Sequence, residues 1–524
     1  MDSTTETIIE NLNEVKLKKM LLNLERRTNE NQKLRIKYAD NPAKFAASET
    51  ELFAVLDDLQ SVSTQPELYH VLITKKAIPI LISLLSHENS DISAKVINMI
   101  QEMADLDDEE GQEATEALID SFTQENIVDL LISNLSRLDG SIKEEAGAIN
   151  NSLAIIESLI DYNSQVATVS SKPLIQWMLK QLKKSQEFNA IKLSISELLS
   201  VLLMNAHENR LHLGDLNGMD ILLQQVAYYR RVAPVTGDEH EFLEQIINCL
   251  CTSVQDCEQN RESFFQEEGV DLIELILREK REAAKKSTIK LSALKLFNHV
   301  LATDKNDDPI VAKCCARFVE VLGLRVLFPI YNNPKLALSE KVKKKEYYQV
   351  LDEVEEHTSG IILALLKYCQ NSEYLQRILV KFAEGNFEKL NRTIKLHEKY
   401  FRIVSNDDED DDNNENNNKT NDDSQIVAAV KSSARFTLRT SDYIILLVCY
   451  LSEHFETYDP KSGETFKNYI SNLLKCRPQL RHQIAIEVRK HIEEVEGESL
   501  EEHNSLELLL DHFEQTAMFR KPTT

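Results

Sequence analysis

Apolar residues recur with helical spacing along most of this chain. Six segments carry apolar side chains at positions i, i+3, i+4 and i+7, which places them on one face of a helix. They begin at Ala77, Asn126, Lys172, Gly218, Gly269 and Gly323. The interval between them is about 50 residues, close to the ~40–47 residues of armadillo and HEAT repeats.

A second marker accompanies two of these segments. Asn209 stands nine residues before Gly218, and Asn260 stands nine residues before Gly269; an arginine follows each asparagine. The shared interval indicates a structural repeat. We expect each glycine to end one helix in a left-handed conformation, so that the chain can turn into the next helix.

Each segment is followed by a second amphipathic stretch. These stretches cover residues 90–104, 141–160, 189–204, 239–254, 287–302 and 346–369. Two helices per unit cannot bury their apolar faces alone and must stack on their neighbours. The sequence therefore predicts an all-α, armadillo/HEAT-like right-handed superhelical solenoid with a long concave face.

The flanks of the repeats have different patterns. Residues 1–60 predict N-terminal capping helices, and residues 61–404 predict a solenoid of about six repeats. Residues 405–424 are rich in Asn and Asp and predict a disordered acidic linker. Residues 425–524 resume helical patterns and predict a C-terminal helical segment.

Charge narrows the range of partners. The formal net charge is −26, and the sequence pI is near 5.0. Nucleic-acid binding needs clustered positive charge, so no direct nucleic-acid contact is expected. The expected partners are proteins with Lys/Arg-rich segments, which the negative charge attracts. The longest apolar run, residues 443–451, is too short to span a bilayer. No secretory signal or C-x-x-C pair is present, so we expect an intracellular protein with reduced cysteines.

Four residues are candidates for partner binding. In armadillo units the inner helix presents polar residues to the concave groove. Glu102 and Glu157 fall at comparable positions of the first two units, and Asn298 and His299 at a related position of the fifth. The hypothesis is that Glu102 and Glu157 hold a Lys/Arg-rich peptide through charge-assisted hydrogen bonds. The alternative is an ordinary solvated helix face.

Motifs of enzymes and metal sites are absent from the sequence. There is no Gly-rich phosphate loop, nucleophile elbow or kinase signature, and no Cys/His set has zinc spacing. We therefore expect neither catalysis nor a cofactor or metal. Trp177 is the sole tryptophan, so the repeated Trp/Asn ladder of nuclear import adaptors cannot form, and Trp177 is expected in the core.

Several segments resemble a known family. Residues 64–72, 137–146, 315–325 and 381–400 are similar, in order and separation, to the beta-catenin-like (catenin-beta-like) family, and the resemblance covers roughly residues 14–400. It implies a nuclear armadillo protein that associates with the spliceosome through the Nineteen complex. It also implies binding to basic nuclear-localisation-type segments of a Myb-like splicing factor.

The function expected from these observations is protein binding. The first hypothesis is a non-enzymatic scaffold in pre-mRNA splicing that holds basic segments of its partners. The alternative is an adaptor for nuclear transport or chaperoning of basic cargo. Exposed repeat ends and the N-terminal cap also make a homodimer possible. The basic N-terminal extension of animal members has no counterpart in this sequence, which leaves the import route open.

Overall fold

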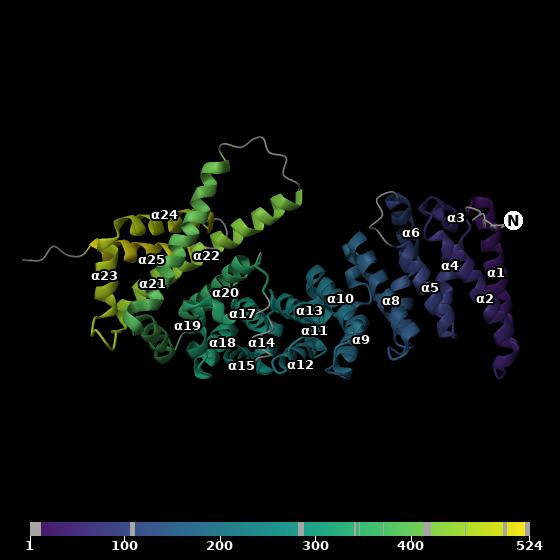
Figure 1. The fold of residues 1–524 in the computed structure, drawn as a ribbon, viewed down its shortest axis with the longest axis horizontal. Helices are drawn as coiled ribbons and strands as arrows, with labels where there is room; N and C mark the ends of the chain where they lie inside the picture. The colour runs from purple at the N-terminus through teal and green to yellow at the C-terminus, as the bar shows by residue number, and fades with distance from the viewer. Residues whose placement is uncertain are drawn as a thin grey trace, which may run out of the picture. The chain divides into compact units, whose positions relative to one another are not determined.

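The structure is a computed structural model of the chain, in which almost every described segment is helical (Figure 1). It describes residues 12–104, 111–280, 288–305, 307–339, 342–344, 346–369, 371–411, 421–455, 457–495 and 500–518. Within these ranges the only β pairing is an isolated bridge between Tyr458 and Thr465. The chain forms two compact units, Met1–Ile221 with Thr236–Thr252, and Leu222–Val235 with Ser253–Thr524.

The repeat helices begin where the apolar periodicity predicts them. The first helices, which open the repeats, are α3 (Tyr69–Thr74), α6 (Gln112–Gln124), α11 (His207–Asp215), α14 (Glu258–Gln266) and α18 (Pro309–Glu320). The second helices are α4 (Ala77–Leu85), α7 (Ile127–Leu135), α9 (Ser171–Lys184), α12 (Gly218–Tyr229), α15 (Gly269–Arg278) and α19 (Leu324–Asn332). The third helices are α5 (Ser90–Met103), α8 (Lys143–Tyr162), α10 (Ala190–Asn205), α13 (Gly237–Val254), α17 (Ile289–Leu301) and α20 (Tyr347–Tyr368).

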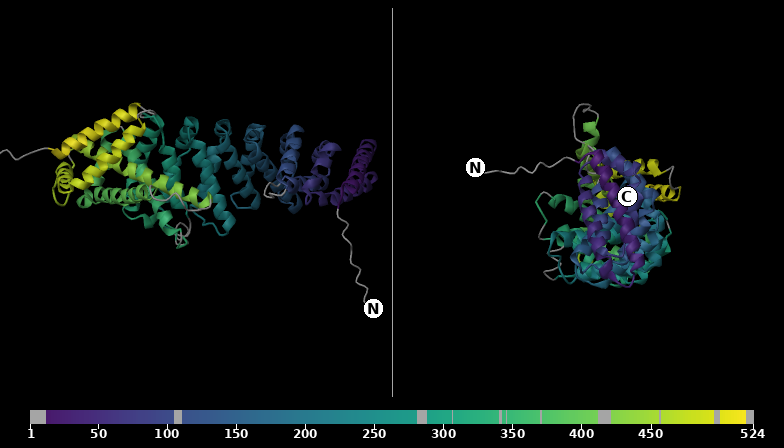
Figure 2. Two further views of the ribbon diagram at one scale, coloured as in Figure 1. Left: turned by 90° about the horizontal axis from the view of Figure 1, so that it is seen from above. Right: turned by 90° about the vertical axis from the view of Figure 1, so that its right-hand side faces the viewer.

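Each repeat thus has three helical segments, and the prediction of two was wrong. In the third repeat a 3₁₀ turn, η4 (Ser164–Thr168), replaces the short first helix. Among the first helices, α11 and α14 carry a weak amphipathic signal because they are strongly polar, as in the α14 sequence EQNRESFFQ. α6 and α18 are longer, with 13 and 12 residues, and are amphipathic. Third helices stack on one another within each unit, α5 on α8 and α8 on α10 in the first, and α17 on α20 in the second (Figure 2).

The turn into each second helix uses one left-handed residue. At these six turns the residue with positive φ, between 49° and 66°, is Lys76, Asn126, Ser170, Asn217, Glu268 or Leu322. Gly218, Gly269 and Gly323 directly follow three of them and do not have positive φ. The expectation that these glycines adopt the left-handed conformation was therefore wrong.

The glycines are instead required by close packing. A Cβ atom on Gly218 would lie 2.4 Å from Cδ1 of Leu213, and one on Gly269 would lie 2.5 Å from the Phe264 ring. Gly323 has the same relation to the Phe318 ring, at 2.5 Å. In all three repeats the glycine makes room for a buried apolar side chain five residues earlier.

The spacing shared by the two asparagines also has a structural cause. Nδ2 of Asn209 donates to the carbonyl oxygens of Leu202 at 2.8 Å and Ala167 at 2.9 Å. Nδ2 of Asn260 donates to the carbonyl oxygen of Ser253 at 2.8 Å. Leu202 and Ser253 lie in the last turns of α10 and α13, whose carbonyls have no partner within the helix. Each fully buried asparagine therefore caps the preceding third helix.

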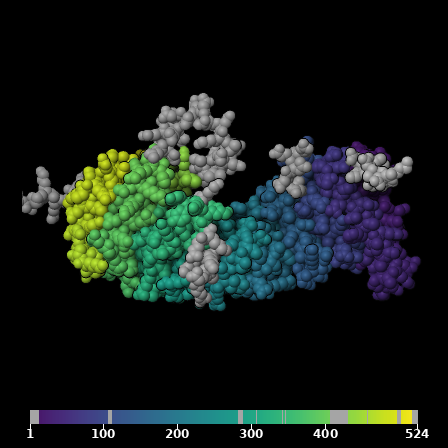
Figure 3. Space-filling model, in the orientation of Figure 1, coloured from purple at the N-terminus to yellow at the C-terminus, as the bar shows by residue number. Residues whose placement is uncertain are grey.

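Additional helices flank the repeats. In the first unit α1 (Glu14–Lys37) packs on α2 (Ala46–Leu59), α3 and α4. In the second unit the chain continues with α21 (Ser372–Asp411), α22 (Asn421–His454), α23 (Phe466–Cys476), α24 (Pro478–Val495) and α25 (Leu500–Met518). Within each unit, neighbouring segments of the sequence form adjoining bands of the surface, as expected for stacked repeats (Figure 3).

The structure describes only part of the predicted acidic linker, residues 405–424. α21 extends to Asp411 and α22 begins at Asn421, so residues 412–420 of the linker lie outside the described part of the chain. Its disorder, like the predicted domain boundaries, stays a prediction. Among the described helices, no single one is long and apolar enough to span a membrane. Pro66–Thr74 and Ala77–Leu85, bent by 90°, meet that criterion only as a pair.

The capping role of the asparagines predicts a loss of stability on truncation. Asn209→Ala and Asn260→Ala each leave buried carbonyl groups without a donor, so each should lower the free energy of unfolding by about 1–3 kcal/mol. Asn205 makes a similar hydrogen bond to the Val201 carbonyl but is exposed. Asn205→Ala should change stability by less than about 0.5 kcal/mol. Urea denaturation followed by circular dichroism measures all three, and equal effects would contradict the capping role.

Candidate functional site

Carboxylates gather on the third helices of the first unit. Glu157 and Asp161 lie on α8, Glu197 on α10, and Asp238 and Glu241 on α13. Burial raises the pKa of Glu157, and the negative charges of Asp161 and Glu197 raise it further. Burial, Glu241 and Asp238 raise the pKa of Glu197 in the same way. These five residues, here called the acidic ladder, therefore form one set of mutually repelling groups across three stacked helices.

The described part of the chain places no positive charge beside Glu157 or Glu197. Among the described residues, no basic side chain contributes to lowering the pKa of Glu157 or Glu197. Both glutamates are half-buried, whereas Asp161, Asp238 and Glu241 are exposed. Half-buried like charges without a partner are unfavourable, and a cation placed beside them relieves both the repulsion and the lost solvation. The arrangement is suited to binding ammonium or guanidinium groups.

The structure separates Glu102 from this ladder. Glu102 lies on α5 and is exposed, and its carboxylate accepts hydrogen bonds from Gln60 Nε2 at 2.6 Å and Ser63 Oγ at 2.7 Å. Gln60 and Ser63 belong to the segment that follows α2. Glu102 is not among the groups that raise the pKa of Glu157. Its carboxylate is thus already used to attach the N-terminal segment to the first repeat.

Asn298 and His299 lie on α17 in the second unit, in a different chemical setting. Asn298 Nδ2 lies 3.4 Å from His357 Nδ1 on α20. Burial lowers the pKa of His357 to about 3, with His299 and Lys295 adding to the effect. Burial and Lys295 also lower the pKa of His299. This neutral cluster offers hydrogen bonds but no negative charge, so it does not continue the ladder.

The other ladder carboxylates were missed by the sequence reasoning. Asp161 lies one helical turn after Glu157, and Glu197 occupies the exposed side of the next third helix. The sequence contains 86 acidic residues, so a carboxylate on a helix carries little information by itself. The useful signal is recurrence on the same face of successive third helices, and that requires the helix boundaries to be known.

The chain belongs to a known family. A family model described as "Catenin-beta-like, Arm-motif containing nuclear" matches residues 1–487. This chain is a member of the catenin-beta-like family. It is 38% identical to human Beta-catenin-like protein 1 over 392 residues, 74% of this chain and 66% of the human protein. It is 28% identical to the Schizosaccharomyces pombe homolog over 393 residues, 74% of this chain and 64% of that protein.

The matches cover just under two thirds of the length of these relatives. The resemblance expected over residues 14–400 is confirmed, and the family match reaches into α24. Among solved structures, that of Uso1-1 aligns with a TM-score of 0.48 and 10% identity, over 88% of this chain and 76% of that chain. The armadillo assignment of this catenin-beta-like chain rests instead on the family and on its three-helix repeats.

Trp177 and most of the cysteines lie in the packed interior of this family member. Trp177 is buried, as predicted, and its Nε1 donates to the Leu135 carbonyl at 3.0 Å. Seven of the eight cysteines are buried and Cys476 is exposed; none forms a disulfide. Burial raises the pKa of Cys314 to about 12, which disfavours the reactive thiolate. In the described ranges no group of His, Cys, Asp and Glu side chains is arranged to hold a metal ion.

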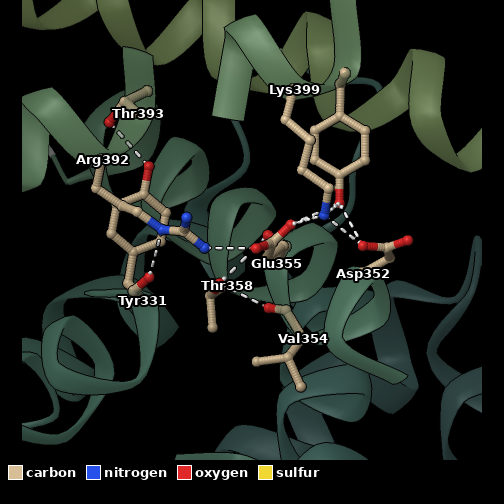
Figure 4. Close-up of polar contacts among 9 residues, drawn as sticks. Tyr331, Asp352, Val354, Glu355, Thr358, Arg392, Thr393 and Lys399 are labelled. Atoms are coloured by element: carbon tan, nitrogen blue, oxygen red, sulfur yellow. Dashed lines mark hydrogen bonds and ion pairs between the residues drawn. The ribbon is translucent and has the colours of Figure 1, made fainter. Parts of the chain in front are cut away.

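A cluster of ion pairs in the second unit is also structural (Figure 4). The carboxylate of Glu355 on α20 accepts hydrogen bonds from Arg392 Nη2 at 2.5 Å and Lys399 Nζ at 2.6 Å, both on α21. Tyr400 Oη donates to it at 2.8 Å. Burial opposes ionisation of Glu355, but Lys399, Arg392 and Tyr400 together keep its pKa below the usual value. The cluster joins α20 to α21.

The Glu355 cluster predicts acid sensitivity. Because the folded state lowers the pKa of Glu355, the cluster contributes stability above the unfolded-state pKa, and that contribution is lost as pH falls through the folded pKa. Glu355→Gln should reduce stability by about 1–3 kcal/mol at neutral pH and by less in acid. Urea midpoints measured from neutral pH into the acid range test this prediction, and Glu493→Gln, at an exposed residue, is the control. A loss that is independent of pH would contradict it.

Proposed function

We propose that this chain is a non-enzymatic, nuclear scaffold of the pre-mRNA splicing machinery that binds Lys/Arg-rich segments of partner proteins on the acidic ladder. The observation that carries the proposal is the pair Glu157 and Glu197, two half-buried carboxylates on adjacent third helices that raise one another's pKa or have it raised by further carboxylates, with no basic neighbour among the described residues. A basic segment lying across α8, α10 and α13 supplies the missing positive charges. Its ammonium and guanidinium groups donate charge-assisted hydrogen bonds to the ladder.

The energetics of such binding are linked to protons. A bound cation favours the ionised carboxylates, so at pH values near the raised pKa of Glu157 and Glu197 binding is coupled to the release of protons. Affinity for a basic peptide therefore rises as pH rises through the raised pKa values of these groups. It also falls with salt, because part of the attraction is long-range and screened. The overall charge of −26 favours approach of a basic segment from a distance.

The sequence resemblance supports the identity of the partner. Membership of the catenin-beta-like family favours association with the spliceosome through the Nineteen complex, and a basic segment of its Myb-like factor as the ligand. The alternative, an adaptor for nuclear transport or chaperoning of basic cargo, finds less support. The sole tryptophan of the chain is buried against α7, so no series of indole rings is available to separate lysine side chains.

Charge reversal on the ladder tests peptide binding. Glu157→Lys combined with Glu197→Lys should weaken binding of a fluorescein-labelled Lys/Arg-rich nuclear-localisation-type peptide by about tenfold or more, since each lost charge-assisted contact is worth ~1.5–3 kcal/mol. Glu113→Lys combined with Glu125→Lys, at two exposed residues outside the ladder, is the control with the same change in net charge. Glu102→Lys should have the smaller effect, because that carboxylate is already hydrogen bonded to Gln60 and Ser63. Fluorescence anisotropy at low salt measures all of these.

The outcomes of this experiment are distinct. Equal weakening by Glu113→Lys/Glu125→Lys would mean that net charge, and not the ladder, attracts the peptide. Unchanged affinity in the double variant would overturn the ladder as the binding site. Raising the pH of the wild-type titration should strengthen binding, and the double variant should lose that pH dependence.

Affinity purification tests the splicing role. The tagged chain, recovered from nuclear extract, should bring down the Nineteen complex and its Myb-like factor, identified by mass spectrometry. The Glu157→Lys/Glu197→Lys variant should lose the Myb-like factor. Recovery of transport receptors without splicing proteins would favour the adaptor function instead.

A further inference from the structure

A cleft of about 850 Å³ opens in the second unit, apart from the acidic ladder. One wall consists of the third helices α17 and α20, and the other of α22 and residues of α24 and α25. α20 and α22 pack side by side (Figure 1). The floor is apolar, with Leu301, Leu363 and Ala364. The volume lies within the ~300–1,000 Å³ of ordinary ligand sites.

Positive charges line this cleft in an otherwise acidic protein. Lys431, Arg435 and Arg439 follow one another at four-residue spacing on α22, which places them on one face of the helix. Arg439 forms an ion pair with Glu494 on α24. Arg435 is exposed, and among the described residues it has no hydrogen bond or ion pair. Its guanidinium group is thus free to bind an anion at the mouth of the cleft.

Lys367 adds a positive charge from the α20 wall. Its Nζ lies 5.3 Å from the ring centre of Tyr368 and 5.9 Å from that of Tyr443. Within the described part of the chain no carboxylate forms an ion pair with it, although Asp304 and Glu502 also face the cleft. Burial lowers the pKa of Lys367, and the charges of Glu502 and Asp304 only partly oppose this. A half-buried ammonium group held between two rings is stabilised by an added carboxylate.

The cleft also offers an apolar contact at its edge. Phe436 follows Arg435 on α22 and is 47% exposed. Aromatic residues, phenylalanine among them, and arginine are enriched in protein–protein interfaces. The site thus combines two positive charges, one from each wall, with an exposed ring and an apolar floor.

We propose that this cleft binds an acidic peptide segment of a partner protein. Arg435 and Lys367 each take a carboxylate of the segment, and Phe436 and the apolar floor take a hydrophobic side chain between them. A peptide is favoured over a nucleic acid because a long polyanion would be repelled by a chain with a net charge of −26. A short segment meets the local charge of the cleft, whose lining has four basic residues against the three carboxylates Asp304, Glu494 and Glu502. This site is independent of the proposed binding of basic segments.

Binding of two opposite probes to the full chain tests the proposal. The probes are a short fluorescein-labelled peptide of glutamates flanking a Leu-Phe pair, and the same peptide with lysine in place of glutamate. Wild-type protein should bind the acidic probe, and Arg435→Glu should weaken that binding about tenfold or more. Phe436→Ala should weaken it severalfold. Both residues are exposed, so both variants should retain the wild-type melting temperature.

Two further variants complete the design. Lys475→Glu changes the net charge by the same amount as Arg435→Glu. Lys475 lies at an exposed position of α23, outside the cleft, so this variant should leave acidic-probe binding unchanged. Glu157→Lys/Glu197→Lys should impair only the lysine probe. No acidic-probe binding by wild-type protein, or equal weakening by Lys475→Glu and Arg435→Glu, would overturn the proposal. Tighter binding of single-stranded oligouridine than of the acidic probe, lost in Arg435→Glu, would overturn the choice of a peptide.

Discussion

Stacking of third helices is the constraint on which the arrangement of this chain depends. A single amphipathic helix cannot bury its apolar face alone, and in the first unit α8 buries Ile155, Ile156 and Leu159 while α10 buries Leu198 and Leu199. The stack fixes which side of each helix remains accessible. Glu157 and Glu197 lie on that side, so the same packing that stabilises the repeats brings their carboxylates together.

A small set of local contacts permits this stacking. One left-handed residue turns the chain into each second helix, and in three repeats the glycine after it accommodates the buried residue five positions earlier. Asn209 and Asn260 then satisfy the carbonyls at the ends of the preceding third helices. In the second unit α22 lies against α20, and its line of basic residues gives the adjoining cleft the opposite charge to the ladder. One type of scaffold thus presents two chemically different faces, each within its own unit.

Much of the fold could be predicted from the sequence, because helical periodicity and repeat spacing are strong signals. All six apolar segments form second helices, and the Asn-Arg marker does identify a repeated structure. The first helices were not predicted as separate elements, since a helix such as α11 has little apolar periodicity of its own. The role assigned to Gly269 was wrong because its requirement comes from a neighbouring ring and not from its own backbone conformation.

The candidate site was less predictable than the fold. Glu157 is part of the ladder, but the structure gives Glu102 a different set of partners and places Asn298 beside a buried neutral histidine. Which carboxylates interact depends on the relative rotation of stacked helices. Local sequence does not encode that rotation, so Glu197 and Glu241 could not be distinguished from the many other acidic residues.

The most direct test of the central claim is the pKa of Glu157 in the free and peptide-bound protein. Carbon-13 labelling of glutamate carboxyl groups, with Glu157→Gln to assign the signal, allows titration by NMR. We expect a pKa above the usual value in the free protein, and a fall when a Lys/Arg-rich peptide is added. An ordinary pKa in the free protein, unchanged by the peptide, would show that the ladder is a solvated surface and not a binding site for basic segments.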